Sequence, residues 1–254
     1  MATFHIRVDA TRSVSALLVE PRDATACLTL AHGAGAGMTH PFMDAAAQGL
    51  AARRIATLRY QFPYMEQGSK RPDSAPLAQA TVRAAVAEAN KRLPELPLFA
   101  GGKSFGGRMT SQAQAQAPLD AVRGLVFFGF PLHAVGKPSD QRAAHLFQVA
   151  VPMLFLQGAK DKLAELTLLE PMLHKLGRKA SLHIVADADH SFHVPARSGR
   201  RDADVMAEIL DVVCRMGQQA YRRMTLRAIG GTSLTTAVAK VARWRAAAAA
   251  LARS

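Results

Sequence analysis

The chain has 254 residues, of which 49% are hydrophobic, and this length suits one large α/β domain. Its 18 Gly and 13 Pro are ordinary counts, which exclude collagen-like and low-complexity proteins. No apolar run reaches the roughly 18 residues of a membrane span, and the first residues lack the apolar run of a signal peptide, so we expect a cytoplasmic protein. Cys27 and Cys214 are too few for a disulfide framework or a structural zinc site.

The net charge of +13 is concentrated at one end of the chain. Residues 217–254 contain seven basic residues and no acidic one, so residues 1–216 carry only the other +6. No stripe of Lys and Arg interleaved with aromatic residues occurs in this larger part. The distribution therefore argues against nucleic-acid binding as the main function.

The hydrophobic pattern predicts an opening hairpin followed by alternating strands and helices. Residues 4–8 and 14–19 alternate with period two, as an antiparallel hairpin does. Short continuous apolar runs, typical of parallel strands buried on both faces, then alternate with helical stretches. We expect a doubly wound, mostly parallel sheet of about eight strands with the hairpin at one edge. The later strands are predicted at 27–31, 55–60, 96–100, 122–128, 152–156 and 182–185, and the helices at about 42–53, 76–92, 105–116, 140–149, 163–176 and 202–216.

This pattern ends near residue 216, which divides the chain into a main domain, 1–216, and a basic C-terminal extension, 217–254. Gly230-Gly231-Thr232 separates an Ala-rich basic stretch, 237–250, from the main domain. We expect the extension to be helical or disordered. It is either a solvated tail or a helix that contacts an acidic partner.

A serine stands between glycines where a predicted strand meets a helix. Gly102, Ser104 and Gly106 match G-x-S-x-G, the elbow that presents a nucleophilic serine above a sheet. A phosphate loop ending at Ser104 would need glycine at position 97, where Pro97 stands. A dinucleotide fingerprint starting at Gly33 fails likewise, because Met38 occupies its last glycine position, so no cofactor is expected.

The partners of such a serine follow two later strands. An acid, Asp161, comes after strand 152–156 and a histidine, His190, comes after strand 182–185. Ser104, Asp161 and His190 thus have the chain order of a hydrolase triad, each at the carboxyl end of a different strand. Asp187 or Asp189 could instead orient the histidine, in which case Asp161 caps a helix.

Other residues near the strand ends have weaker signals. His193 lies three residues from His190, but without further ligands nearby we expect a structural residue or a pocket wall rather than a metal ligand. His40 and His133 are the remaining histidines closest to strand ends and are candidates to line the pocket. The loop 32–38 is made of small residues, as an oxyanion hole requires, and the N–H of Phe105 is expected to be the other donor.

These motifs together resemble the α/β-hydrolase superfamily over about residues 15–216. The resemblance is to its small single-domain branch, which groups bacterial hydrolase-like proteins with animal testis-expressed and chromatin-complex-subunit homologues and is distantly similar to dienelactone hydrolases. The motifs that carry it are AHGAGAGM at 31–38, LRYQFPYMEQG at 58–68, FAGGKSFGGRM at 99–109, FFGFPLH at 127–133, VPMLFLQGAKD at 151–161 and DADHSFHV at 187–194.

The resemblance implies roles for five residues. Ser104 is the nucleophile, Asp161 the acid and His190 the base, and the backbone N–H groups of Phe105 and Ala34 form the oxyanion hole. A family stretch that lies by the pocket matches Arg59, Tyr60 and Tyr64, without an implied role.

The predicted function is that of a serine hydrolase that cleaves a small ester, lactone or thioester through an acyl-enzyme on Ser104. Only about 20 residues, 131–151, connect the sixth and seventh predicted strands, so we expect little or no lid. The resemblance to chromatin-complex subunits also permits an alternative, a hydrolase-fold scaffold or protein-interaction subunit without catalytic activity. The basic extension has no counterpart in the family.

Overall fold

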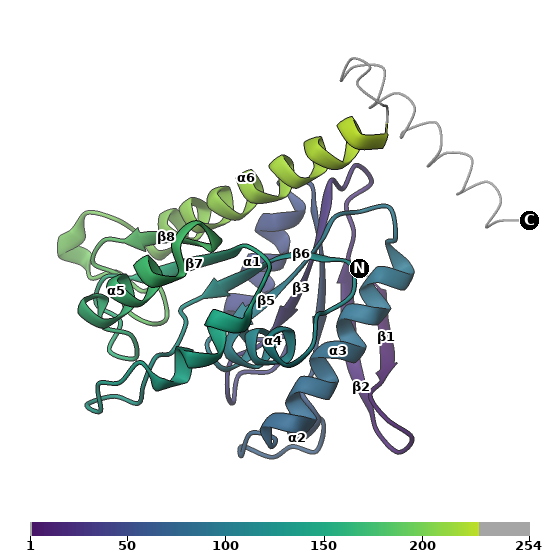
Figure 1. Ribbon diagram of the computed structural model, residues 1–254, viewed down its shortest axis with the longest axis horizontal. Coiled ribbons are helices and arrows are strands. Elements are labelled where there is room, and N and C mark those ends of the chain that lie inside the picture. The colour runs from purple at the N-terminus through teal and green to yellow at the C-terminus, as the bar shows by residue number, and fades with distance from the viewer. Residues whose placement is uncertain (1, 229–254) are drawn as a thin grey trace, which may run out of the picture.

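An eight-stranded mixed sheet runs through the computed structural model, which describes residues 2–228 (Figure 1). The spatial strand order is β1-β2-β4-β3-β5-β6-β7-β8. Strand β2 is antiparallel to both β1 and β4, and all other neighbours are parallel. This confirms the predicted sheet. Its strands are β1 (Ala2–Arg7), β2 (Ser13–Val19), β3 (Ala26–Ala31), β4 (Ile55–Tyr60), β5 (Leu98–Lys103), β6 (Val122–Phe128), β7 (Met153–Gly158) and β8 (Ala180–Val185).

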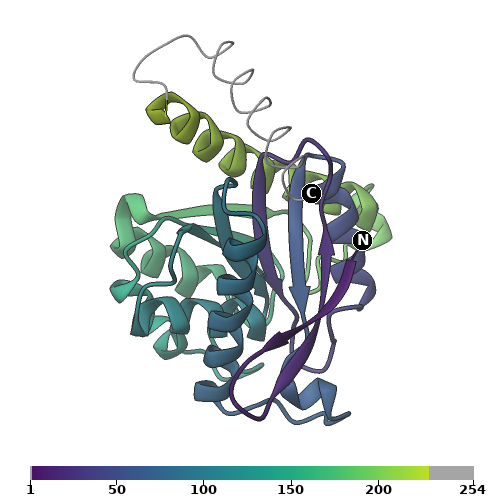
Figure 2. The same ribbon diagram turned by 90° about the vertical axis from the view of Figure 1, so that its right-hand side faces the viewer.

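The edge hairpin β1–β2 is closed by a polar turn (Figure 2). Asp9 Oδ1 accepts hydrogen bonds from the backbone N–H groups of Thr11 at 2.8 Å and Arg12 at 2.9 Å. Such an aspartate turn fixes the register of the hairpin, in which Arg7 lies opposite Ser13. At the opposite edge, β8 is half-exposed, whereas β3 and β4 are buried along their whole length.

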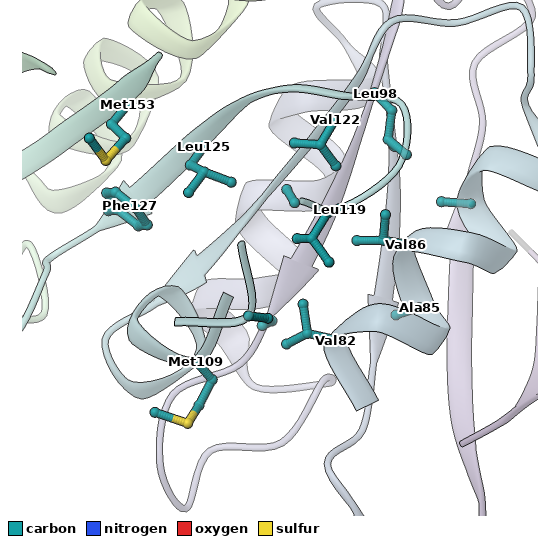
Figure 3. Close-up of a cluster of buried hydrophobic side chains, with 14 of the residues drawn as sticks. Val82, Ala85, Val86, Leu98, Met109, Leu119, Val122, Leu125, Phe127 and Met153 are labelled. Atoms are coloured by element: carbon teal, nitrogen blue, oxygen red, sulfur yellow. The ribbon is translucent and has the colours of Figure 1, made fainter. Parts of the chain in front are cut away.

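Helices cover both faces of the sheet and enclose two apolar clusters. On one face, α1 and α6 pack against β3, β4 and β6 through residues such as Leu50, Ile209 and Val126. On the other face, α3, α4 and α5 cover the larger cluster, part of which is seen in Figure 3 between Val82 and Phe127. The helices are α1 (Pro41–Ala51), α2 (Pro63–Glu66), α3 (Ala75–Arg92), α4 (Phe105–Gln116), α5 (Leu166–Leu176) and α6 (Asp202–Ala228), with the 3-10 helices η1 (Gln141–Gln148), η2 (Gly177–Lys179) and η3 (Ala196–Ser198).

Three helices differ from the sequence prediction. The segment predicted as a helix over 140–149 forms the 3-10 helix η1. Helix α5 begins at 166 instead of 163, because Asp161 holds the preceding residues in a turn: its Oδ1 accepts the N–H of Leu163 and its carbonyl accepts the N–H of Ala164. Helix α6 extends to residue 228, beyond the predicted end at 216.

Helix α6 crosses residue 217 without a break, so the C-terminal extension starts as a continuation of this helix. A Cβ placed on Gly217 would lie 3.3 Å from the Ala26 Cβ, which shows that the helix still packs on the sheet there. The Ala-rich stretch 237–250 and four of the seven basic residues of the extension lie outside the described residues. Within residues 2–228, no helix combines the length and apolar composition that a membrane span requires.

Gly101 on β5 has no room for a side chain, so replacing it should destabilise the protein. A Cβ at Gly101 on β5 would lie 1.9 Å from the Val126 carbonyl oxygen on β6, and neither backbone can move without breaking the sheet. We expect Gly101→Ala to lower the free energy of unfolding by about 3 kcal/mol. Gly136→Ala is the control: this glycine has a φ of +70° but open space around it, so strain alone applies, about 1 kcal/mol. Urea unfolding would measure both, and equal losses would contradict the packing argument.

Candidate active site

Ser104 lies on a sharp turn between β5 and α4. Its φ of 50° and ψ of −115° are outside the regions that L residues normally adopt, so surrounding contacts must hold the turn. The flanking glycines allow these contacts: a Cβ on Gly102 would lie 2.4 Å from the Ala31 carbonyl oxygen, and one on Gly106 would lie 2.6 Å from the same atom. The turn therefore packs directly on the end of β3, and only glycine fits on either side of the serine.

The structure brings Ser104, His190 and Asp161 together. His190 Nε2 lies 2.9 Å from Ser104 Oγ, and His190 Nδ1 lies 2.6 Å from Asp161 Oδ2. Because a carboxylate only accepts hydrogen bonds, Nδ1 carries the proton, and Nε2 of the neutral ring is left to accept from the serine hydroxyl. The His190 side chain is 23% exposed and that of Asp161 is fully enclosed, so the site opens to solvent at the serine end.

The Asp161 carboxylate is buried, but it accepts two further hydrogen bonds. Gln157 Nε2 donates to Oδ2 at 2.5 Å, and the Leu163 N–H donates to Oδ1 at 2.8 Å. The Gln157 amide is itself fixed by the Phe130 N–H, which donates to its Oε1 at 3.0 Å. These donors satisfy a charge that would otherwise be costly to bury. Gln157 was not anticipated, although a polar residue in the apolar strand β7 is the signal that marks it.

The other two acids near His190 have different partners. Asp187 forms an exposed ion pair with Lys160, with 2.6 Å between Oδ1 and Nζ. Asp189 Oδ1 accepts the N–H groups of Ser191 and His193 at 2.8 and 3.0 Å and so closes the loop that carries His190. The acid beside the imidazole is therefore Asp161.

The three other histidines that the sequence suggested near the site are placed as follows. His193 lies at the surface, where its Nδ1 is 2.9 Å from Asp202 Oδ2. The His40 Nδ1 accepts the Phe42 N–H at the start of α1. The His133 side chain is buried and its Nδ1 bonds the Ala134 carbonyl at 2.9 Å. Within residues 2–228, no group of His, Cys, Asp and Glu side chains is arranged to hold a metal ion.

The loop after β3 runs beside the serine. A Cβ placed on Gly33 would lie 3.8 Å from the Ser104 Cβ, so the start of this loop passes directly beside the serine turn. Three contacts hold this loop: the Gly35 N–H donates to the Tyr64 hydroxyl at 2.9 Å, the Met38 N–H to Gln61 Oε1 at 2.8 Å, and the Met38 carbonyl accepts from the buried Arg59 at 3.0 Å.

His32 at the start of this loop has a structural role. Its Nδ1 lies 2.8 Å from the Gly33 carbonyl, and its Nε2 accepts the Phe62 N–H at 3.1 Å. Burial lowers the pKa of His32 to about 4, so the ring is neutral at physiological pH. The ring ties the loop to the segment after β4, which carries Tyr64.

The matched family stretch lies against the loop that runs beside Ser104. Arg59 and Tyr64 both contact the loop beside Ser104, while Tyr60 is buried beneath, with its ring centroid 5.6 Å from that of Phe62. Phe62 also packs edge-on against Phe105, the residue after the serine, at 5.3 Å. An aromatic wall therefore borders the serine on this side.

Comparison with known proteins agrees with this architecture. Residues 24–218 match the family model described as an alpha/beta hydrolase domain. The protein belongs to the alpha/beta hydrolase family.

Solved structures with the same fold include three from bacteria, all of low sequence identity. A dienelactone hydrolase from Anabaena variabilis is 22% identical, with a TM-score of 0.69 over 84% of this chain and 94% of that one. An alpha-beta serine hydrolase homologue from Coxiella burnetii is 16% identical, with a TM-score of 0.67 over 84% and 96%. A serine hydrolase without a lid from Xanthomonas campestris is 19% identical, with a TM-score of 0.63 over 91% and 96%.

In this alpha/beta hydrolase, Lys103 joins the serine turn to the histidine loop. Its Nζ donates to the His190 carbonyl at 2.5 Å and lies 5.4 Å from the ring centre of Phe192 and 5.8 Å from that of Phe42. Burial lowers the pKa of Lys103 to about 8, although the carboxylates of Asp161 and Asp189 oppose this shift. The surroundings of Lys103 could not be predicted from the sequence, because the rings of Phe42 and Phe192 come from distant parts of the chain.

The lowered pKa of Lys103 predicts a pH-dependent stability. Lys103 loses its proton near pH 8 in the folded protein but near its ordinary pKa of 10.5 in the unfolded chain. The unfolded state binds more protons between these values, so this contribution to stability rises with pH. From pH 7 to 9.5, we expect the wild type to gain about 2 kcal/mol relative to Lys103→Met. Urea unfolding across this range measures the difference.

The control for this experiment is Lys91→Met, which removes an exposed lysine on α3. Its difference from the wild type should stay constant over the same pH range. A constant difference for Lys103→Met as well would show that the Lys103 ammonium is not desolvated.

Proposed function

We propose that this protein is a serine hydrolase that cleaves small ester-type bonds through an acyl-enzyme on Ser104. The observation that carries this proposal is the continuous hydrogen-bonded chain from the Ser104 hydroxyl through His190 to the buried Asp161. A hydroxyl, an imidazole and a carboxylate in this order are what nucleophilic acyl transfer requires.

In the first half of the reaction, Ser104 Oγ attacks the carbonyl carbon of the substrate while His190 Nε2 takes the hydroxyl proton. The Asp161 carboxylate stabilises the resulting imidazolium and holds its orientation. When the tetrahedral intermediate collapses, the bond to the leaving oxygen or sulfur breaks, and His190 gives that atom its proton. The acyl group then remains on Ser104 as an ester.

In the second half, His190 takes a proton from water, and the hydroxide attacks the acyl carbon. Collapse of the second intermediate breaks the bond to Ser104 Oγ, which regains the proton from His190. The products are a carboxylic acid and an alcohol or thiol, or a hydroxy acid when the substrate is a lactone.

The developing oxyanion is stabilised by the backbone N–H groups of Phe105 and Ala34. Phe105 is the first residue of α4, so its N–H has no partner within the helix and lies at the positive end of the helix dipole. Ala34 follows Gly33, whose close approach to Ser104 supports its place as the second donor. The loss of one such donor typically lowers the rate about 10²–10³-fold.

The connection between β6 and β7 favours small substrates. Residues 129–152 contain only the short 3-10 helix η1, which packs on the domain through Ala143 and Leu146 and leaves Phe147 exposed. The neighbour from Xanthomonas campestris is likewise a serine hydrolase without a lid, and the one from Anabaena variabilis acts as a dienelactone hydrolase. Short esters, lactones and thioesters are the substrate class we propose.

A fluorophosphonate probe tests the nucleophile directly. We expect the probe to label the full-length wild type, whereas Ser104→Ala shows no labelling, because the reagent needs an activated serine. Ser111→Ala is the matched control, because this serine also contacts a histidine, His145, at 2.8 Å but lies buried in α4. It should be labelled like the wild type.

Turnover of a panel of short esters, lactones and thioesters is measured on the same proteins. Equal labelling of wild type and Ser104→Ala would contradict the assignment of the nucleophile. If the wild type shows neither labelling nor turnover, the result would favour the alternative function, a hydrolase-fold scaffold that acts through protein contacts.

The Tyr64 hydroxyl provides a second test, since it holds the loop of the proposed oxyanion hole. Tyr64→Phe keeps the buried ring but leaves the Gly35 N–H without its acceptor. We expect kcat for a short ester to fall about tenfold with little change in KM, because the loop contacts the transition state more than the bound ester. Tyr221→Phe on α6 is the control and should leave kcat unchanged. A rise in KM at constant kcat would indicate that the loop binds substrate instead.

A further inference from the structure

We infer that Arg108 and Arg142 form an anion-binding subsite beside Ser104, which selects ester substrates that carry a carboxylate. This inference rests on the proposed function for its role in catalysis, and it names the substrate class of that same site.

Arg108 lies one helical turn from the serine. Its N–H donates to the Ser104 carbonyl at 3.1 Å, so the two residues are stacked along the start of α4. Side chains on a helix lean toward its N-terminus, which directs the Arg108 side chain back over the turn that holds Ser104 and Phe105. Arg108 is half-buried, as are Ser104 and Phe105, and the three thus share one partly open face of α4.

A direct contact between α4 and η1 places Arg142 beside Arg108. Ser111 Oγ lies 2.8 Å from His145 Nε2 and also donates to the Arg108 carbonyl at 2.9 Å. Arg142 precedes His145 by three residues, and side chains with this spacing are aligned on a 3-10 helix. Arg108 and Arg142 each precede one member of the Ser111–His145 contact by three residues, and their charges act on each other.

Among the described side chains, neither guanidinium has a counter-ion. Within residues 2–222, no carboxylate lies within 4 Å of Arg108 or Arg142, whereas the half-buried Arg53 and Arg200 pair with acids. The half-buried Arg83 also lacks an acid, but its guanidinium donates to the carbonyl oxygens of Ala113 and Ala117. Two neighbouring cations that lack an acid repel each other, and the free energy of that repulsion falls when an anion binds between them. Two neighbouring arginines without an acid beside them can therefore accept an anionic ligand, which the arginines of a structural ion pair cannot.

The described groups around Arg108 and Arg142 supply no negative charge, and the nearby His145 is neutral. Burial, followed by the charge of Arg142, lowers the pKa of the Arg108 guanidinium. Burial, followed by the charge of Arg108, lowers the pKa of His145 to about 4, so this histidine is neutral. A planar carboxylate matches the paired donors of a guanidinium. Because Arg108 lies one helical turn from Ser104, the carboxylate of such a substrate would be separated from its scissile carbonyl by a short carbon chain.

Binding to the full-length Ser104→Ala protein tests the subsite without turnover. The probes are monomethyl succinate, glutarate and adipate, each compared with its dimethyl ester, which differs only by one methyl group and one charge. We expect at least one monoester to bind about tenfold or more tightly than its diester, measured as Kd by titration calorimetry. In the Arg108→Gln and Arg142→Gln versions of this protein, the preference should disappear.

The matched control is Arg123→Gln, which removes an exposed arginine at the amino end of β6, away from the strand ends that carry Ser104. It should retain the preference. Equal affinity for monoester and diester, absence of monoester binding, or a preference that persists in both Arg108→Gln and Arg142→Gln would overturn the inference.

This binding experiment separates the two proposals. If the wild type resists the fluorophosphonate probe but Ser104→Ala binds the monoesters through Arg108 and Arg142, the subsite stands and the hydrolase proposal fails. If the probe labels Ser104 while the monoesters show no preference, the hydrolase proposal stands and the subsite fails.

Discussion

The buried carboxylate of Asp161 is the constraint on which the rest of the site depends. It is 3% exposed, and donors from three directions, those of His190, Gln157 and Leu163, surround it. A charge removed from water needs such partners, so separating the loops after β7 and β8 would cost the carboxylate one of its three donors, the His190 ring. The same contact fixes the proton on His190 Nδ1 and leaves Nε2 free for Ser104. Stability and proposed chemistry therefore share one interaction.

Glycines at the strand ends make this convergence possible. A Cβ on Gly158 would lie 2.4 Å from the carbonyl oxygens of Ala188 and Asp189, and one on Gly129 would lie 3.3 Å from the His190 ring. Together with Gly106 against β3, these positions let four loops meet at one edge of the sheet. Lys103 adds a second link between the serine turn and the histidine loop, because its side chain donates to the main-chain carbonyl of His190.

Much of this could be predicted from the sequence, because parallel strands deliver their carboxyl ends to one edge. That rule placed the regions of Ser104, Asp161 and His190 together, and continuous apolar runs located most strands. It favoured Asp161 but left Asp187 and Asp189 open as alternatives, because spacing along the chain does not show which carboxylate faces the ring. The 3-10 form of η1, the late start of α5, and the environment of Lys103 depend on turn contacts and on residues far apart in the sequence.

The central claim is that the Asp161 carboxylate orients His190 to take the proton of Ser104 as the serine attacks the substrate. The most direct measurement is kcat for a short ester in Asp161→Asn, compared with Asp187→Asn and Asp189→Asn. An amide in place of the Asp161 carboxylate would present an N–H to the ring and favour the wrong tautomer, so we predict a loss of about 10⁴-fold. The other two variants should stay within a few-fold of the wild type. A loss below about tenfold in Asp161→Asn, or a larger loss in Asp189→Asn, would contradict this account.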